Sequence, residues 1–263
     1  FAMEMAIRKA QESGIGLVAV RNSNHYGIAG YYTHMAAERG LMGISMTNTE
    51  AIMVPTFGRQ PMLGTNPIAL AMPAKPVIFS FDASTTVVPR GKLEVYNKRG
   101  DPLPSGWALD ETGAVSENPA TVLDSIIQKR GGGILPLGGA GEEHSGYKGY
   151  GFGMVCEIFT GILSGGLTSD RVNRTPGHTG IAHFLGAMRP DLFGDGEAII
   201  ASFSEYLERI RHSDAAQGQQ RIYVHGEKEA EARLDRVQNG IPVNAKTYEE
   251  LNRIGQDVGA GTI

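Results

Sequence analysis

The sequence predicts an α/β fold, with strands and helices that alternate along the chain. Residues 16–47 have the pattern strand, helix, strand, a unit of the kind that builds parallel sheets. Residues 77–82 alternate between apolar and polar positions and are rich in Val, Ile and Phe, which favour a strand. Three segments near the C-terminal end are predicted helices, and residues 195–213 show the periodicity of an amphipathic one. Both kinds of element are therefore expected throughout the chain.

The chain opens with a helix predicted over residues 1–13, which Gly14 ends. Its apolar stripe is expected to consist of Ala2, Met5, Ala6 and Ala10. This helix has neither an N-terminal cap nor an initiator methionine, so we expect a fragment of a longer protein. The next predicted elements are a strand at 16–20, a polar loop at 21–27, a helix near 28–39 closed by Gly40 and a strand at 42–47.

The remaining elements follow from the same signals. A Thr247/Glu250 capping box is expected to open the last helix. The predicted strands are 68–72, 77–82 and 179–188, and the predicted helices are 90–97, 122–129, a glycine-rich one at 147–166, 195–213, 227–240 and 247–259.

Composition limits the class of protein. The chain has 263 residues, a length sufficient for one large domain or two smaller ones. It is 41% hydrophobic and carries a formal net charge of −4. The mild acidity gives no reason to expect nucleic acid or an anionic membrane surface as a partner. The single cysteine, Cys156, excludes an internal disulfide framework and suits a reducing compartment. No apolar run approaches a membrane span, so we expect a soluble, cytoplasmic protein without membrane partners.

Common sequence motifs are incomplete here. Residues 14–19, GIGLVA, fit Gly-x-Gly-x-x-Ala but lie between a helix and a strand, the reverse of the Rossmann order. Residues 141–149, GEEHSGYKG, nearly form a phosphate-binding P-loop, but Tyr147 precedes Lys148 and no Ser or Thr follows. No cluster of His and Cys has the spacing of metal ligands, and no serine-hydrolase Gly-x-Ser-x-Gly occurs. We therefore predict no metal site.

Three polar residues remain as candidates, each with an ordinary alternative. His25 follows a predicted strand, where α/β sheets bind ligands, and its imidazole can act as a general acid near neutral pH. Alternatively, it is one of seven histidines that falls in a polar loop by chance. Asp82 ends a strand and can orient a histidine, bind a hydroxyl or cap a turn. Lys148 precedes a helix and can bind an anion with the helix amides, or it is a solvated loop lysine.

Several stretches together resemble the second, non-Rossmann type of the malate/L-lactate dehydrogenase family, which includes sulfolactate and ureidoglycolate dehydrogenases. These stretches run in family order over nearly the whole chain. They are GIGLVAVRNSNHYG, GISMTNTEAIMVPTFG, GTNPIALAMP, FDAST, YKGYGFGMVCEIFTGILSGG, HFLGAM and HGEKEAEARLDRVQNGIPV.

The resemblance implies a three-layer α/β fold with a mixed sheet of the sulfolactate dehydrogenase type, formed by residues 1–263 with an inserted subdomain at roughly 50–180. It implies an NAD(P)-dependent oxidoreductase that transfers a hydride between NAD or NADP and a small 2-hydroxy or 2-oxo acid. It also implies a homodimer. Family members usually begin about ninety residues earlier, with a helical region that carries a Ser-His-Gly motif. A truncated or non-catalytic relative that keeps only dinucleotide binding is the alternative.

The resemblance also assigns roles to residues. His25 is the proposed catalytic histidine of an Arg-Asn-x-x-His loop, although the upstream Ser-His-Gly histidine is the proton donor in some relatives. Glu227 is expected to accept hydrogen bonds from ribose hydroxyls, and His225 replaces a proline common in relatives. The implied cofactor-binding residues are Thr49, Ile78, Phe79, Ser80, Phe81, Asp82, Ala83, Ser84, Tyr147, Lys148, Gly226, Glu227 and Lys228.

Overall fold

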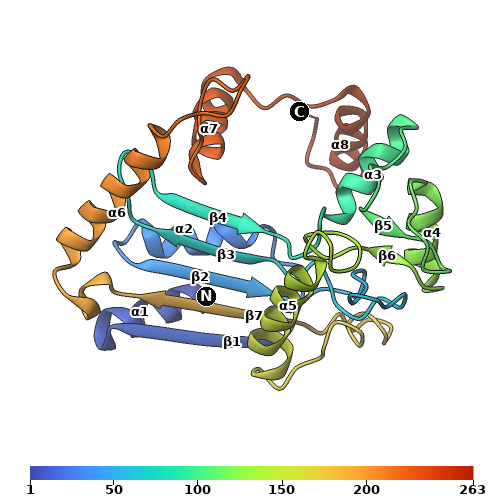
Figure 1. Ribbon diagram of the computed structural model, residues 1–263, viewed down its shortest axis with the longest axis horizontal. Helices are drawn as coiled ribbons and strands as arrows, with labels where there is room; N and C mark the ends of the chain where they lie inside the picture. Colours follow the sequence, from blue (N-terminus) through green and yellow to red (C-terminus); the bar gives the residue numbers. More distant parts are fainter. Residues whose placement is uncertain (263) are drawn as a thin grey trace.

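The computed structural model describes residues 1–262 and is built around one five-stranded sheet (Figure 1). The strand order is β1-β7-β2-β3-β4, and every neighbouring pair runs antiparallel. The strands are β1 (Ile15–Ser23), β2 (Met42–Thr47), β3 (Ile68–Met72), β4 (Phe79–Ala83) and β7 (Ile181–Met188). The expected mixture of parallel and antiparallel neighbours is therefore not found in this sheet.

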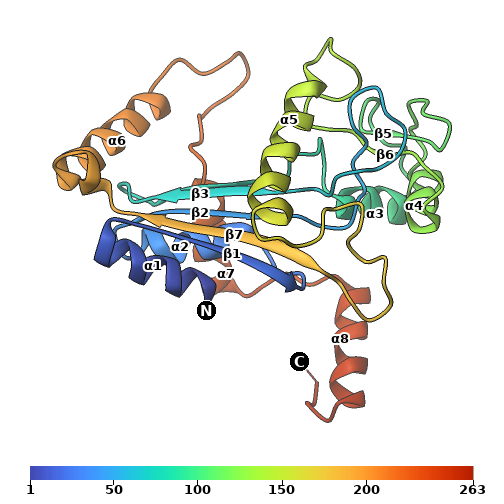
Figure 2. The same cartoon turned by 90° about the horizontal axis from the view of Figure 1, so that it is seen from below.

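Helices cover both faces of the sheet and make three layers, which confirms the predicted fold class (Figure 2). Helices α1 (Ala2–Ser13) and α2 (Ala29–Ala37) pack on one face, where Met3, Ile7 and Leu185 belong to one buried cluster. Helix α5 (Gly146–Glu157) and the π-helical turn η1 (Ile158–Ile162) lie on the other face, where Cys156 packs against Met46 and Phe184.

The strand–helix–strand unit at the start of the chain is present, but its two strands do not pair. β1 and β2 run in the same direction, and β7 lies between them, antiparallel to both. The local pattern predicted the elements correctly. It could not predict that a strand more than a hundred residues further along would be inserted between them.

Two details of the helix predictions are wrong. The buried stripe of α1 is Met3, Ala6, Ile7 and Ala10, because the longer Met3 and Ile7 side chains fill the space above the sheet, while Ala2 and Met5 are only partly buried. Helix α8 (Ala245–Asp257) begins before the expected capping box. Its N-cap is Asn244, whose side chain accepts a hydrogen bond from the Thr247 backbone N–H.

A second, two-stranded sheet forms beside the main one from β5 (Ala108–Leu109) and β6 (Gly133–Ile134). Helices α3 (Arg90–Arg99) and α4 (Pro119–Gln128) pack with it around a separate buried cluster. Residues 68–83 lie within the range expected for the inserted subdomain yet supply β3 and β4 to the main sheet. The division into a core and an inserted subdomain stays a prediction.

The C-terminal part is helical. The short 3-10 turn η2 (Pro190–Phe193) leads from β7 to α6 (Gly196–Arg211), and α7 (Glu227–Asn239) lies near the β4 edge of the sheet (Figure 1). Helix α8 stands away from the sheet (Figure 2). Within residues 1–262, no helix has the length and apolar character required to cross a membrane.

Candidate functional site

One end of the main sheet collects several of the predicted site residues. β1, β2 and β4 run in the same direction, so the segments that follow them emerge at the same end (Figure 1). These segments contain His25, Thr49 and Asp82–Ser84, and β7 begins at this end. Polar residues from distant parts of the sequence are thereby brought to one edge.

His25 lies just beyond an irregularity in β1. Val20 pairs with His183 and Ser23 with Ile181, so β1 holds one extra residue in this interval and forms a β-bulge in which Asn22 has a φ of 56°. Bulges commonly redirect side chains next to functional sites. The side chain of His25 is exposed, which leaves it accessible to a ligand.

The ring of His25 has a defined hydrogen bond. Its Nδ1 accepts a hydrogen bond from the Gly27 backbone N–H at 3.1 Å. In the neutral ring the proton therefore sits on Nε2, which can donate to a substrate oxygen. A histidine that acts as an acid is protonated on both nitrogens. Its Nδ1 then no longer accepts the hydrogen bond from the Gly27 N–H.

Three rings support the loop that carries His25. Tyr26 stacks on His183, with ring centroids 4.2 Å apart, and on Tyr32 at 4.6 Å. The Tyr26 hydroxyl is 2.9 Å from Ser45 Oγ, and burial raises the pKa of Tyr26 well above its ordinary value. Tyr26 is therefore a neutral, anchored side chain at neutral pH.

His183 is a residue of this site that sequence reasoning missed. It is only 3% exposed, and its Nδ1 lies 2.8 Å from Thr47 Oγ1. Burial lowers the pKa of His183 to about 4, the nearby Asn24 backbone opposes this shift, and the charge of His25 adds to it. The segment HFLGAM contributed to the resemblance, but its strand pattern gave no sign that the histidine would stack on Tyr26, next to His25.

Asp82 caps a helix. Its Oδ2 accepts a hydrogen bond of 2.6 Å from the backbone N–H of Gly30, in the first turn of α2. Partial burial raises the pKa of Asp82, and this hydrogen bond opposes the shift. A carboxylate at a helix N-terminus is favourable, because it satisfies a free N–H and complements the helix dipole. Capping was one of the expected alternatives, although the helix it caps is 52 residues earlier in the chain.

Thr49 and Lys148 approach the same end of the sheet from the α5 side. Thr49 Oγ1 accepts a hydrogen bond from the Thr65 backbone N–H, and Thr65 in turn accepts one from Thr85. The backbone of Leu137 bonds Thr85 and packs against Gly149, where a Cβ would lie 2.3 Å from the Leu137 carbonyl oxygen. Glycine at this position therefore lets α5, with Lys148 in its first turn, come close to the end of β4.

Lys148 and Tyr147 are both exposed. The Lys148 ammonium lies 5.8 Å from the Tyr147 ring centroid and forms no ion pair with a carboxylate among residues 1–262. Helix α5 lacks a side-chain cap, since the Ser145 hydroxyl does not bond its first turn. A free cation and uncapped helix amides are suitable partners for an anion.

The structure also brings Gly226 against the start of β4. The Ser80 N–H donates to the His225 carbonyl oxygen at 3.1 Å, and a Cβ on Gly226 would lie 2.9 Å from the carbonyl oxygen of Ile78. Gly226 has a φ of 100°, which favours glycine. Residues 78–80 and 226–228, which were predicted as parts of one cofactor site, are thus adjacent, while they lie toward the opposite end of β4 from Asp82–Ser84.

Glu227 has a structural role that the sequence did not reveal. Its buried carboxylate accepts hydrogen bonds from Arg211 and from the Val224 N–H, and Arg221 lies 3.4 Å away. Burial raises the pKa of Glu227, but these hydrogen bonds and charges outweigh it, so the net pKa is lowered. Both oxygens are engaged within the chain, and the expected bond to ribose hydroxyls stays a prediction.

A second carboxylate, Glu157, is buried and has no cationic partner among residues 1–262. Its oxygens accept hydrogen bonds from Asn48, Asn66 and both the backbone and hydroxyl of Ser169, at 2.7–3.1 Å. Asn48 also accepts a bond from the Ala182 N–H at 2.8 Å. This network fastens the segments after β2 and before β3 and β7 to α5.

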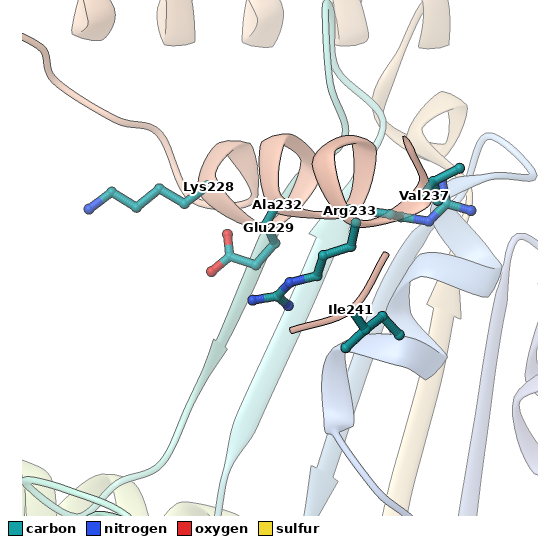
Figure 3. Close-up of a pocket in the computed structure, with 7 residues that line it drawn as sticks. Lys228, Glu229, Ala232, Arg233, Val237 and Ile241 are labelled. Carbon is teal, nitrogen blue, oxygen red and sulfur yellow. The ribbon is translucent and has the colours of Figure 1, made fainter. Parts of the chain in front are cut away.

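A groove of about 540 Å³ opens beside α7 (Figure 3). Among the predicted cofactor residues only Lys228 lines it, and neither His25 nor Lys148 does. The lining residues are Lys228, Glu229, Ala232, Arg233, Arg236, Val237 and Ile241. The groove is therefore separate from the histidine end of the sheet. Within residues 1–262, no three His, Cys, Asp or Glu side chains are grouped as metal ligands.

Comparison with known proteins agrees with the fold. The sequence matches the malate/L-lactate dehydrogenase family over residues 1–252, so the chain belongs to this family, as the resemblance predicted. It is 46% identical over 259 residues to a malate dehydrogenase of Pyrococcus abyssi, a match that covers 98% of this chain and 70% of the relative.

Two solved structures are similar to the whole chain. The malate dehydrogenase of Pyrococcus horikoshii has a TM-score of 0.88 at 42% identity, covering 100% of this chain and 70% of that one. The sulfolactate dehydrogenase of Methanocaldococcus jannaschii has a TM-score of 0.83 at 34% identity, covering 98% and 71%. The fold is thus of the sulfolactate dehydrogenase type, in a family of dehydrogenases that act on 2-hydroxy acids.

Proposed function

We propose that this chain is a nicotinamide-dependent oxidoreductase that interconverts a small 2-hydroxy acid, of the malate or lactate kind, and its 2-oxo acid. Membership of the malate/L-lactate dehydrogenase family supports the reaction class. The single observation that carries the assignment to this site is the exposed His25, which a β-bulge and a buried ring stack hold at the ligand-accessible end of the sheet.

The residues at this end fit a dinucleotide. Lys148 is an exposed cation without a carboxylate partner among residues 1–262, and it stands beside uncapped amides of α5. Such a pair suits a pyrophosphate. Thr49 and Ser84 add small hydroxyl side chains on the segments that leave the same end of the sheet as His25. The cofactor supplies or accepts the hydride when it is bound, and the choice between NAD and NADP is left to the assay below.

His25 handles the proton in this proposal. Hydride addition to a ketone leaves an alkoxide that needs a proton, and an imidazole is the side chain best suited to supply it near neutral pH. In the reverse direction Nε2 of the neutral ring removes the hydroxyl proton, which requires the tautomer protonated at Nδ1 and release of the Gly27 contact. Since the Gly27 N–H occupies Nδ1, it is Nε2 that faces the substrate.

The test is an activity screen of the full-length protein against a panel of 2-oxo acids, following NADH and NADPH oxidation. His25→Asn keeps a hydrogen-bonding side chain but removes acid–base capacity, so the turnover number should fall by ~10²–10⁴-fold with little change in cofactor affinity. His34→Asn is the matched control. A raised Michaelis constant with turnover within a few-fold of native would instead make His25 a substrate-orienting donor.

Oxidation of neither cofactor, with dinucleotide binding retained, would favour the non-catalytic alternative. We also propose a homodimer in the cytoplasm, by the family resemblance. A monomer mass by light scattering at micromolar concentration would contradict the dimer.

A further inference from the structure

We infer that His183 is a positioning residue for His25, which it holds in place through the ring of Tyr26. This inference rests on the proposed function, because it concerns the histidine to which that function assigns the proton. His183 does not reach the substrate side itself, since it is only 3% exposed.

The first step of the argument is the place of His183 in the sheet. β7 is the central neighbour of β1 and β2, and His183 pairs with Val20 on one side and with Thr47 on the other. The Val20 pair is the last regular one before the bulge in β1. His183 therefore lies at the point where the regular pairing of β1 with β7 ends and the loop that carries His25 begins.

The second step is the ring stack that holds the loop where the regular pairing of β1 with β7 has ended. The rings of His183 and Tyr26 are 4.2 Å apart and inclined by only 5°, a nearly parallel stack. Tyr32 covers the stack at 4.6 Å from Tyr26 and donates a hydrogen bond of 2.7 Å to the Tyr26 carbonyl oxygen. Because Tyr26 directly follows His25, fixing this ring and its backbone fixes the neighbouring imidazole.

The third step is the orientation of the His183 ring. Thr47 Oγ1 donates to the Asn48 carbonyl oxygen at 2.8 Å, so it accepts the hydrogen bond from Nδ1 of His183. The other nitrogen, Nε2, has no hydrogen-bond partner among residues 1–262. His183 has no hydrogen bond to Tyr26, so the stacked face of its ring is the means by which it acts on that residue, while the nearby Asn24 backbone is a further contact with the loop.

The fourth step is charge. The interaction of His25 with His183 shows that the two imidazoles are close enough to influence each other. A neutral ring beneath the loop places no charge beside His25, whereas a cation there would repel a positively charged imidazole. The buried ring thus supports His25 both by shape and by remaining uncharged.

The experiment compares His183→Asn, which keeps an amide for Thr47 but loses the ring, with His183→Phe, which keeps the ring. In the full-length protein, His183→Asn should lower kcat by about 10- to 100-fold, as expected for a misplaced catalytic group, with cofactor affinity unchanged. His183→Phe should recover most of that loss. Equal losses in the two variants, or no loss in His183→Asn, would overturn the inference.

A double-mutant cycle separates positioning from a general structural effect. In a His25→Asn background, His183→Asn should cause no further fall in kcat, because the group that it positions is gone. Independent, multiplicative losses would refute the inference. If His183→Asn fails to fold, Tyr26→Leu removes the same stack from the loop side and must show the same non-additivity.

A measurement without turnover distinguishes failure of the inference from failure of the proposed function. The ¹⁵N resonances of the His25 ring should stay sharp in native protein and in His183→Phe, and broaden or shift in His183→Asn. An inactive native protein with this pattern would refute the proposed function alone. An unchanged His25 spectrum in His183→Asn would refute the positioning role.

Discussion

Acidification should destabilise this protein through His183, and His183→Phe should remove that part of the pH dependence. The buried ring has a pKa lowered to about 4, whereas the unfolded chain has the ordinary value of 6.5. As the pH falls, the unfolded state therefore takes up a proton first. This contribution to stability is complete above the unfolded pKa and is lost as the pH falls from 6.5 toward 4.

The size of the effect follows from the two pKa values. A shift of roughly 2.5 units corresponds to about 3 kcal/mol when the loss is complete below pH 4. Between pH 7 and pH 5 the loss is about 2 kcal/mol, because the unfolded chain is almost fully protonated at pH 5 and the folded ring is not. The titratable groups that face the ring, His25 and Tyr26, are present in both proteins.

The assay is urea unfolding of native protein and His183→Phe at pH 7 and pH 5. The native free energy of unfolding should fall by about 2 kcal/mol more than that of the variant. His144→Phe, which changes an exposed histidine, is the matched control. Parallel losses in native protein and His183→Phe would show that the ring of His183 is not held neutral by burial.

Three further predictions concern other residues of the site. Lys148→Ala should weaken NADH binding by about 10- to 100-fold in calorimetry, the loss of one charge-assisted contact, while Lys148→Arg should stay near native. Asp82→Ala should cost about 1 kcal/mol in urea unfolding by removing the cap on Gly30, and Asp82→Asn, which keeps an acceptor, should cost less. Glu227→Gln should cost about 1.5–3 kcal/mol, because the nearly buried Arg211 loses its buried carboxylate partner and keeps only the exposed Glu208; an unchanged unfolding midpoint would contradict this.

The sequence predicted most elements of the fold because their signals are local. Gly14 does end α1, and the strand ending at Asp82 and the helix at 195–213 lie where periodicity and caps indicated. What it could not predict was pairing between distant segments. The insertion of β7 between β1 and β2 depends on contacts between residues more than a hundred positions apart in the sequence. No turn motif or residue spacing predicts such contacts.

The candidate site was predictable to the same extent. His25 was singled out because it lies in a polar loop after an apolar run and Lys148 because it lies among glycines before a helix, whereas Thr49 came from the resemblance alone. His183 was missed because it lies inside a buried strand, where a histidine has no local signal. The role of Glu227 was also beyond sequence reasoning, since its partner Arg211 belongs to a different helix.

The support of His25 comes from four strands rather than from its own loop. β1 provides the bulge, β7 the ring of His183, and β2 the Thr47 and Ser45 hydroxyls that fix the two stacked rings. β4 provides Asp82, which caps the helix that follows the loop. The strand–helix–strand unit of β1, α2 and β2 contains the bulge and the two hydroxyls. It lacks the supports that come from β7 and β4. The imidazole therefore reaches its final place only when β7 has entered the sheet and β4 has closed its edge, so the geometry of the proposed proton donor depends on the completed sheet.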